Sequence, residues 1–246
     1  MGKIFTSLGL MSGTSGDGVD ASIIKSDGNL ESNKEVIIEI IKDKFFEYDN
    51  TIVKKIHSIR NKINFLNDLK KYSSEIADLE REITLFHAKT SNEMMKNKKI
   101  DLIGFHGHTI YHSPEEKISK QLGDPHLLHQ LTNKNIIFNF RDNDIKNGGE
   151  GAPLAPIYHF AIAKEKKIKL PLNFLNIGGI SNITQFYDNN FNFSARDIGP
   201  GNCMIDKWIR ENSKFHYDKD GELAKSGEIN ELILEQVSEH RQTILE

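Results

Sequence analysis

A short unit of strand, glycine-rich turn and strand occurs twice in the chain, and this repeat limits the folds open to it. The first unit comprises residues 4–11, 12–18 and 19–25, and the second comprises residues 172–177, 178–182 and 183–187. In both, apolar and partly β-branched residues flank a glycine cluster, which is typical of two strands joined by a turn. One unit at the start of each half predicts a duplicated α/β architecture whose two turns face one ligand in a cleft. Two unrelated hairpins are the alternative, because glycine turns are common.

The rest of the pattern also mixes strands and helices. A hairpin signal at Asp27-Gly28 and an apolar run at residues 36–48 predict a third strand and an antiparallel start to the sheet. Helical spacing over residues 50–97 predicts two helices, the second of them long. Further strands are expected at residues 100–105, 135–140 and 191–198, and further helices at residues 124–132, 154–163, 204–212 and from 228 onward. We expect a first domain over residues 1–165 and a second over residues 166–246.

The composition makes several classes of protein poor candidates. The 246 residues include 32 Lys and Arg against 35 Asp and Glu, so no basic surface for duplex nucleic acid is expected. Cys203 is the only cysteine, which excludes an intrachain disulfide and a zinc site of several thiolates. No stretch approaches the ~18 apolar residues of a membrane-spanning helix. We therefore expect a cytoplasmic protein with neither a nucleic-acid nor a membrane partner.

The first glycine turn combines residue types that bind phosphate. It contains three glycines, hydroxyl side chains and two carboxylates, in the run Gly13, Thr14, Ser15, Gly16, Asp17, Gly18, Val19 and Asp20. Backbone N–H groups and hydroxyls in such a turn can converge on an anion, while Asp17 or Asp20 holds a hydrated Mg²⁺ beside it. No Gly-Lys-Ser/Thr follows, so the turn is not a Walker A loop. A polar hairpin turn without a ligand is the alternative.

A second group of candidates lies in the second half. Gly178, Gly179 and Asn182 form the turn, and Asp197 precedes a second glycine cluster that ends at Gly201, just before a predicted helix. The free N–H groups and positive dipole of a helix start can hold a phosphate or sugar oxygen. A structural turn and helix cap would explain each motif taken alone.

A run of charged and glycine residues at 139–153 holds the candidate general base. Asp142 and Asp144 follow a predicted strand and precede glycines that leave room for a ligand, and spacing does not rank one above the other. Arg141 is placed to clamp a substrate carboxylate. A solvated acidic loop without catalytic function is the alternative.

Histidines suggest a different class of enzyme. Five of the ten lie between residues 105 and 130, and on a regular strand His106 and His108 would face the same side. With Asp124 or Asp144 as a third ligand, they would form the metal site of a hydrolase. Gly107 and Thr109 instead favour a turn at this point, which would separate the two rings.

Five motifs together resemble those of the anhydro-N-acetylmuramic acid kinase family. They occupy residues 9–20, 105–109, 148–154, 176–182 and 199–202, and the resemblance extends over residues 3–227. It implies a two-domain actin-like ATPase and sugar kinase fold with mixed sheets. It also implies the reaction, in which Mg-ATP, water and 1,6-anhydro-N-acetylmuramic acid give N-acetylmuramic acid 6-phosphate and ADP during recycling of cell-wall fragments.

The resemblance also implies roles for individual residues. Residues 13–20 would bind the ATP phosphates together with Gly178 and Gly179, and Asp17 would lie near Mg²⁺. Asp144 would take a proton from the water that opens the anhydro bridge, while the freed O6 attacks the γ-phosphate. We expect sugar contacts from Arg141, His106, Asn182 and Asp197. A homodimer is also implied.

The sequence departs from the family pattern at several positions. Gly16, His108, Asn139 and Glu150 stand where a larger apolar residue, Gln, Asp and Gln are expected, and the last two bear on substrate choice. Beyond Leu234 the resemblance ends, so we expect an incomplete second domain without the adenosine-binding segment. A remnant that binds a sugar or a partner without catalysis is therefore the alternative to an active kinase.

Overall fold

The computed structural model describes residues 3–29, 36–190, 192–215 and 217–242. The chain divides into two compact units, one formed by residues 1–175 with 183–196 and the other by residues 176–182 with 197–246. The two-domain boundary near residue 165 stays a prediction. The turn predicted after Asp27-Gly28 includes residues 30–35, and the strand predicted from residue 191 begins at that residue; these positions lie outside the described residues.

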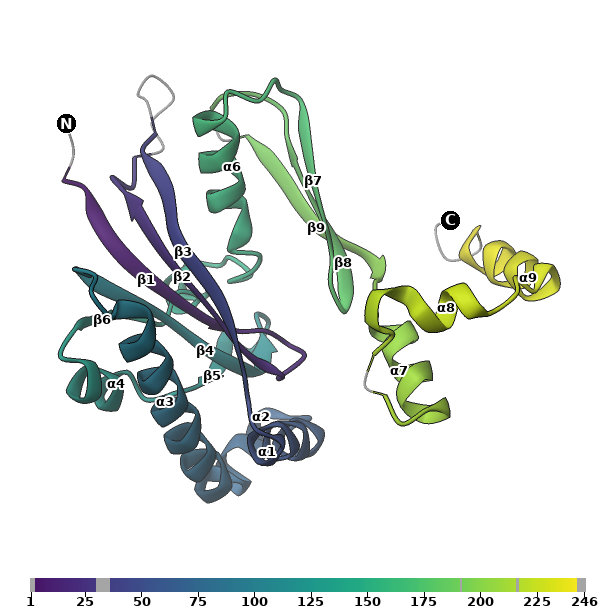
Figure 1. Ribbon diagram of the computed structural model, residues 1–246, viewed down its shortest axis with the longest axis horizontal. Coiled ribbons are helices and arrows are strands. Elements are labelled where there is room, and N and C mark those ends of the chain that lie inside the picture. Colours follow the sequence, from purple (N-terminus) through teal and green to yellow (C-terminus); the bar gives the residue numbers. More distant parts are fainter. Residues whose placement is uncertain (1–2, 30–35, 191, 216, 243–246) are drawn as a thin grey trace. The chain divides into compact units, whose positions relative to one another are not determined.

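A mixed six-stranded sheet is the centre of the first unit (Figure 1). Its strands are β1 (Phe5–Ser12), β2 (Gly18–Ser26), β3 (Ile38–Glu47), β4 (Leu102–Ser113), β5 (Ile118–Leu122) and β6 (Asn135–Ile137). The strand order is β3-β2-β1-β4-β5, and β6 pairs with β4. Strand β2 is antiparallel to both of its neighbours, β1 and β3, whereas β4 is parallel to both β1 and β6. The predicted antiparallel start and the mixed α/β class are therefore confirmed.

Alternating side chains bury one face of this sheet beneath helices. Leu8 and Leu10 of β1 and Ile23 of β2 are almost fully buried, as the period of two in a strand requires when one face meets a core. The covering helices are α1 (Asn50–Lys62) and α3 (Ser73–Met95), with the short α2 (Leu66–Lys71) between them. The two predicted helices, the second of them long, are α1 and α3. The short α2 was not predicted; the Asp68 carboxylate accepts the N–H groups of Asn64 and Phe65 and so starts this separate helix.

Strand β4 does not end in the predicted turn. It continues to Ser113, and its pairing with β1 shifts register at His106, so that Leu10 faces Phe105 whereas Met11 faces Gly107. Gly107 has φ +72°, and a Cβ there would lie 2.2 Å from the Leu122 carbonyl oxygen. A glycine bulge thus bends the strand without ending it. The extension then pairs antiparallel with β5, a strand that was not predicted.

The chain after β5 contains both helices and strands. Helix α4 (Pro125–Thr132) and helix α6 (Ala155–Glu165) are confirmed, whereas the strand expected at residues 135–140 is limited to the three residues of β6. The interpretation of residues 139–153 as a loop was wrong in part, because α5 (Asp142–Lys146) forms within it. A smaller sheet follows, in the order β7 (Leu172–Ile177), β8 (Ile180–Phe186) and β9 (Phe193–Pro200).

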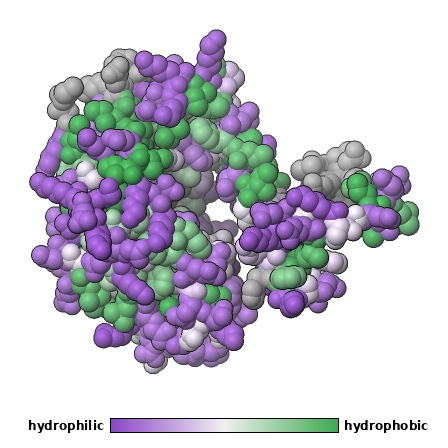
Figure 2. Space-filling model, viewed as in Figure 1, coloured by the Kyte–Doolittle hydropathy of each residue, from purple (hydrophilic) through white to green (hydrophobic). Residues whose placement is uncertain are grey.

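The second unit is mostly helical. The predicted helix at residues 204–212 is α7 (Cys203–Asn212), and the final helical stretch is α9 (Glu231–Gln242); the short η1 (Lys219–Gly221) and α8 (Glu222–Ser226) between them were not predicted. Apolar side chains lie at its surface (Figure 2), including Trp208 of α7, which is 59% exposed. Within the described residues, no helix has the length and apolar character needed to cross a membrane.

Candidate functional site

The turn between β1 and β2 is held by a few hydrogen bonds that leave much of its backbone open. The Gly16 N–H donates to the Gly13 carbonyl over 3.0 Å, and the Tyr48 N–H donates to the Asp17 carbonyl over 2.8 Å. The Ser15 hydroxyl donates to Asp17 Oδ1 over 2.6 Å, and Arg60 donates to the Thr14 carbonyl. An exposed, braced turn with N–H groups and hydroxyls is a structure that can receive an anion.

Two glycines of this turn are required by close packing. Gly16 has φ +69°, and a Cβ there would lie 2.9 Å from Ile56 Cγ2 of α1. At Gly18, a Cβ would lie 2.4 Å from the Phe46 carbonyl oxygen of the neighbouring strand. A larger residue at either position would displace the turn from the sheet.

Buried polar side chains support the turn from below. Ser12 Oγ lies 3.1 Å from His108 Nδ1, and both residues are buried. Burial lowers the pKa of His108 to about 4, with help from the positive charge of Arg60, so this ring is neutral at pH 7. Burial likewise raises the pKa of the Tyr48 phenol, which lies under the same turn. The turn therefore rests on an uncharged polar layer.

The carboxylates of the turn suit a hydrated divalent cation. Asp17 and Asp20 are exposed, and partial burial together with the negative charge of Asp17 raises the pKa of Asp20. Two carboxylates that repel one another would be stabilised by a cation between them. Mg²⁺ binds in proteins through one or two carboxylates, water and substrate phosphates, so the donor set fits it.

The second cluster of the first unit surrounds Asp144. This residue lies on α5, and its Oδ2 accepts the Gly151 N–H over 2.7 Å. The Gly149 N–H donates to the Asp144 carbonyl over 2.9 Å, and a Cβ at Gly149 would lie only 2.2 Å from Asp144 Oδ2. Glycine is required at position 149 because the chain after α5 folds closely over the carboxylate. Asp144 itself remains exposed, so its carboxylate is accessible to a substrate.

The Arg141 guanidinium joins this cluster to β4. Its Nε and Nη2 lie 3.2 and 2.9 Å from His106 Nε2, and its Nη1 donates to the Gly151 carbonyl over 2.6 Å. Burial lowers the pKa of His106, and the charge of Arg141 lowers it further. Arg141, His106 and Asp144, all predicted site residues, are thus brought into one network.

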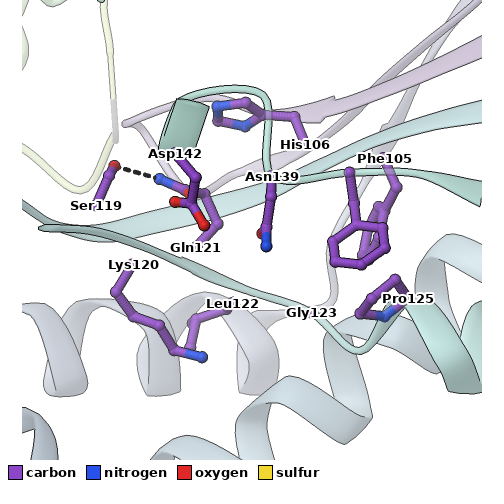
Figure 3. A pocket seen from close by; sticks show the side chains of 11 residues that line it. Phe105, His106, Ser119, Lys120, Gln121, Leu122, Gly123, Pro125, Asn139 and Asp142 are labelled. Carbon is purple, nitrogen blue, oxygen red and sulfur yellow. Dashed lines mark hydrogen bonds between the residues drawn. The ribbon is translucent and has the colours of Figure 1, made fainter. Parts of the chain in front are cut away.

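A cavity of about 260 Å³ lies beside this network (Figure 3). Polar groups from three segments converge on it, namely Gln121 of β5, Asn139 before α5 and Asp142 of α5, and His106 lines it too. Phe105 and Pro125 supply an apolar wall. Asp142 lines the cavity whereas Asp144 does not, a distinction that spacing could not make. Gln121 was not predicted as a site residue. It lies on β5, and the alternation of apolar and polar residues over 118–122 is the sequence signal that could have identified this strand.

The glycine turn of the second unit is closed by its own helix. The Gly179 carbonyl accepts the N–H groups of Gly201 and Cys203 over 3.0 and 3.2 Å, and the Gly178 carbonyl accepts that of Asn202 over 2.7 Å. The expectation of free N–H groups at the start of α7 was therefore wrong for these three donors. Asn182 lies on β8, and Asp197 lies on β9 with an exposed side chain.

The metal-hydrolase alternative does not find its ligands in the described part of the chain. No group of three His, Cys, Asp or Glu side chains there is placed to hold a metal ion. The bulge at Gly107 turns His106 toward Arg141 while His108 contacts Ser12, so the two rings do not form a pair. Asp124 is also engaged, because its carboxylate caps α4 through the N–H groups of His126 and Leu127.

The fold and the family match define the class of protein. A mixed sheet in the order β3-β2-β1-β4, with β6 beside β4 and a glycine and hydroxyl turn after β1, is an actin-like sugar kinase fold. The chain belongs to the anhydro-N-acetylmuramic acid kinase family, which its residues 5–242 match. The expectation that the resemblance ends at Leu234 was therefore wrong, because the match continues through α9.

Relatives with this family's name are similar along nearly the whole chain. The Anhydro-N-acetylmuramic acid kinase of Pelagibacter ubique (strain HTCC1062) is 53% identical over 96% of this chain and 62% of its own length. Those of Agrobacterium fabrum and Rhodospirillum rubrum are 34% and 35% identical, over 93% and 95% of this chain and 61% and 59% of their own lengths. The chain therefore spans about three fifths of the length of these curated relatives.

Proposed function

We propose that this chain forms the catalytic part of an ATP-dependent kinase that acts on 1,6-anhydro-N-acetylmuramic acid. The products are N-acetylmuramic acid 6-phosphate and ADP. The observation that carries this proposal is the Asp144 carboxylate, which is held at Oδ2 by the Gly151 N–H and is exposed to solvent. Family membership supplies the substrate class.

Asp144 acts as general base in this proposal. It takes a proton from a water whose oxygen bonds to the anomeric carbon, the bond from that carbon to O6 breaks, and O6 attacks the γ-phosphorus of ATP as ADP leaves. Phosphoryl transfer depends on positioning and charge neutralisation more than on a strong nucleophile. A turn of glycines and hydroxyls with a few carboxylates is suited to that task.

The remaining predicted residues divide between the two substrates. Residues 13–20, Gly178 and Gly179 bind the ATP phosphates, and His106, Arg141, Asn182 and Asp197 contact the sugar. Asp17 would hold Mg²⁺ through water, and this ion would neutralise charge on the phosphates. The reaction serves recycling of cell-wall fragments in the cytoplasm, and the enzyme is a homodimer, which light scattering of the purified chain would test.

The test is ADP release by the 246-residue chain with Mg-ATP, with and without the anhydro sugar. We expect sugar-dependent turnover, a loss of at least about 100-fold in Asp144→Asn, and wild-type turnover in Asp78→Asn, which alters an exposed carboxylate of α3. Full activity of Asp144→Asn would remove the proposed base. A folded chain that binds the sugar but neither binds nor hydrolyses ATP would favour the alternative of a sugar-binding remnant.

A further inference from the structure

The Arg141 guanidinium is largely occupied by the protein itself. Three of its five N–H groups have acceptors within the first unit, two at His106 Nε2 and one at the Gly151 carbonyl. A side chain used only to clamp a substrate carboxylate would present a free face with two parallel donors. Arg141 therefore has a task within the protein in addition to any contact with the sugar.

The hydrogen bonds of His106 fix its tautomer. His106 Nδ1 lies 3.0 Å from the Gly107 carbonyl, which can only accept, so this nitrogen carries the proton. Arg141 can only donate, so Nε2 must be the unprotonated acceptor. The ring is thus neutral, with its lone pair directed at the guanidinium.

Gly151 connects Arg141 to Asp144. Its carbonyl accepts from Arg141 and its N–H donates to Asp144 Oδ2, and the two groups flank the same α-carbon. Gly151 is buried and has φ +68°, and a Cβ there would lie 2.7 Å from Ile145 Cδ1. Because Gly151 is buried and packs closely on Ile145, a fixed carbonyl also limits the direction of the N–H.

We propose that Arg141 and His106 are positioning residues for Asp144. His106 holds Arg141, Arg141 holds the Gly151 carbonyl, and the Gly151 N–H fixes Asp144 Oδ2, so that Oδ1 takes the proton from the attacking water. This inference rests on the proposed role of Asp144 as base. It gives His106 and Arg141 an effect on kcat through the orientation of the carboxylate rather than through sugar affinity alone.

The first test measures the network itself, independent of activity. In ¹⁵N NMR spectra of the folded chain, we expect His106 to be protonated at Nδ1 and unprotonated at Nε2. Arg141→Lys keeps the positive charge but loses the planar guanidinium whose N–H groups reach both His106 and Gly151. We therefore expect the Gly151 amide resonance to move and the hydrogen exchange of this amide to accelerate about tenfold. Arg81→Lys, which alters an exposed arginine of α3, leaves that resonance unchanged. An unchanged Gly151 amide in Arg141→Lys overturns the proposal.

The second test uses kinetics and a double-mutant cycle. We expect Arg141→Lys and His106→Leu to lower kcat about tenfold or more, with the KM for ATP changed less than about twofold. His106→Gln, whose amide can both donate to Gly107 and accept from Arg141, should restore most of the loss. Arg141→Lys should add nothing to Asp144→Asn, because both act through one carboxylate.

The outcomes separate this inference from the proposed function. An inactive Asp144→Asn beside Arg141→Lys with wild-type kcat overturns the positioning role and leaves the base in place. A fully active Asp144→Asn overturns the base, and the kinetic part of the positioning role with it. Additive losses in the double variant would place Arg141 in a separate role and also contradict the proposal.

Discussion

The two glycine turns begin from similar sequence patterns but are supported in different ways. The first turn lies on buried Ser12 and His108, beside strands whose inner face packs against α1 and α3. The second turn is closed by carbonyl bonds to the start of α7, while strand residues next to it, such as Ile177, are exposed. Long-range packing therefore supports the first turn, and contacts with the start of α7 support the second. The same motif can be rigid for different reasons, which substitutions should reveal.

Glycine substitution should give the largest difference between the turns. A Cβ at Gly18 would lie 2.4 Å from a backbone oxygen, so Gly18→Ala should lower the free energy of unfolding by about 3 kcal/mol. Gly179 has no heavy atom within 4 Å of such a Cβ, so Gly179→Ala should change it by less than about 0.5 kcal/mol. Urea denaturation of both variants measures this, and equal losses would show that the two turns are supported alike.

Acid should weaken the support of the first turn by a smaller amount for each histidine involved. Burial lowers the pKa of His87 and of His108 to about 4, whereas the unfolded chain binds these protons near pH 6.5. The contribution of these neutral histidines to the free energy of unfolding is therefore fully present above about pH 6.5. It is lost as the pH drops toward 4, and the loss is about 2 kcal/mol per histidine at pH 5. Urea midpoints at pH 7 and pH 5 test this. His108→Gln should reduce the dependence by about half, and a flat profile in the unaltered chain would refute it.

Removal of an ion pair should give the smallest difference in stability between the two units. Lys55 and Glu82 join α1 to α3 at 2.5 Å, whereas Lys207 and Glu211 lie 3.9 Å apart within α7. Both pairs are largely exposed, so we expect about 0.5 kcal/mol from Lys55→Met and no more than about 0.3 kcal/mol from Lys207→Met. Thermal unfolding at low and high salt checks this, since screening should remove the first effect. A larger loss in Lys207→Met would show that the second unit also depends on charge contacts.

Local patterns predicted many elements correctly. The strands around the first turn, the long helix α3 and the helix α4 follow from apolar spacing. Patterns failed where a distant residue decided the outcome. At Gly107 the strand continues because the chain there packs on Leu122, and spacing along the chain contains no information on that contact.

For the site, residue types could be predicted but contacts could not. Asp144, Arg141 and His106 are identifiable from motifs, and the structure places them in one network. Their pairing through Gly151 could not be predicted, because it needs the positive φ at Gly151 and the bulge at Gly107. Which of Asp142 and Asp144 lines the cavity likewise depends on how α5 lies against β5.

The sequence by itself determined the mixed α/β class, the position of both glycine turns and the family resemblance, because these depend on residue type and local spacing. Only the tertiary structure decided which face of β4 each histidine occupies, what supports each turn, and that the Arg141 guanidinium is directed at His106 and Gly151. The physical reason is that hydrogen bonds and burial between residues far apart in the chain depend on how the elements pack, whereas propensities and turn chemistry act within a few residues.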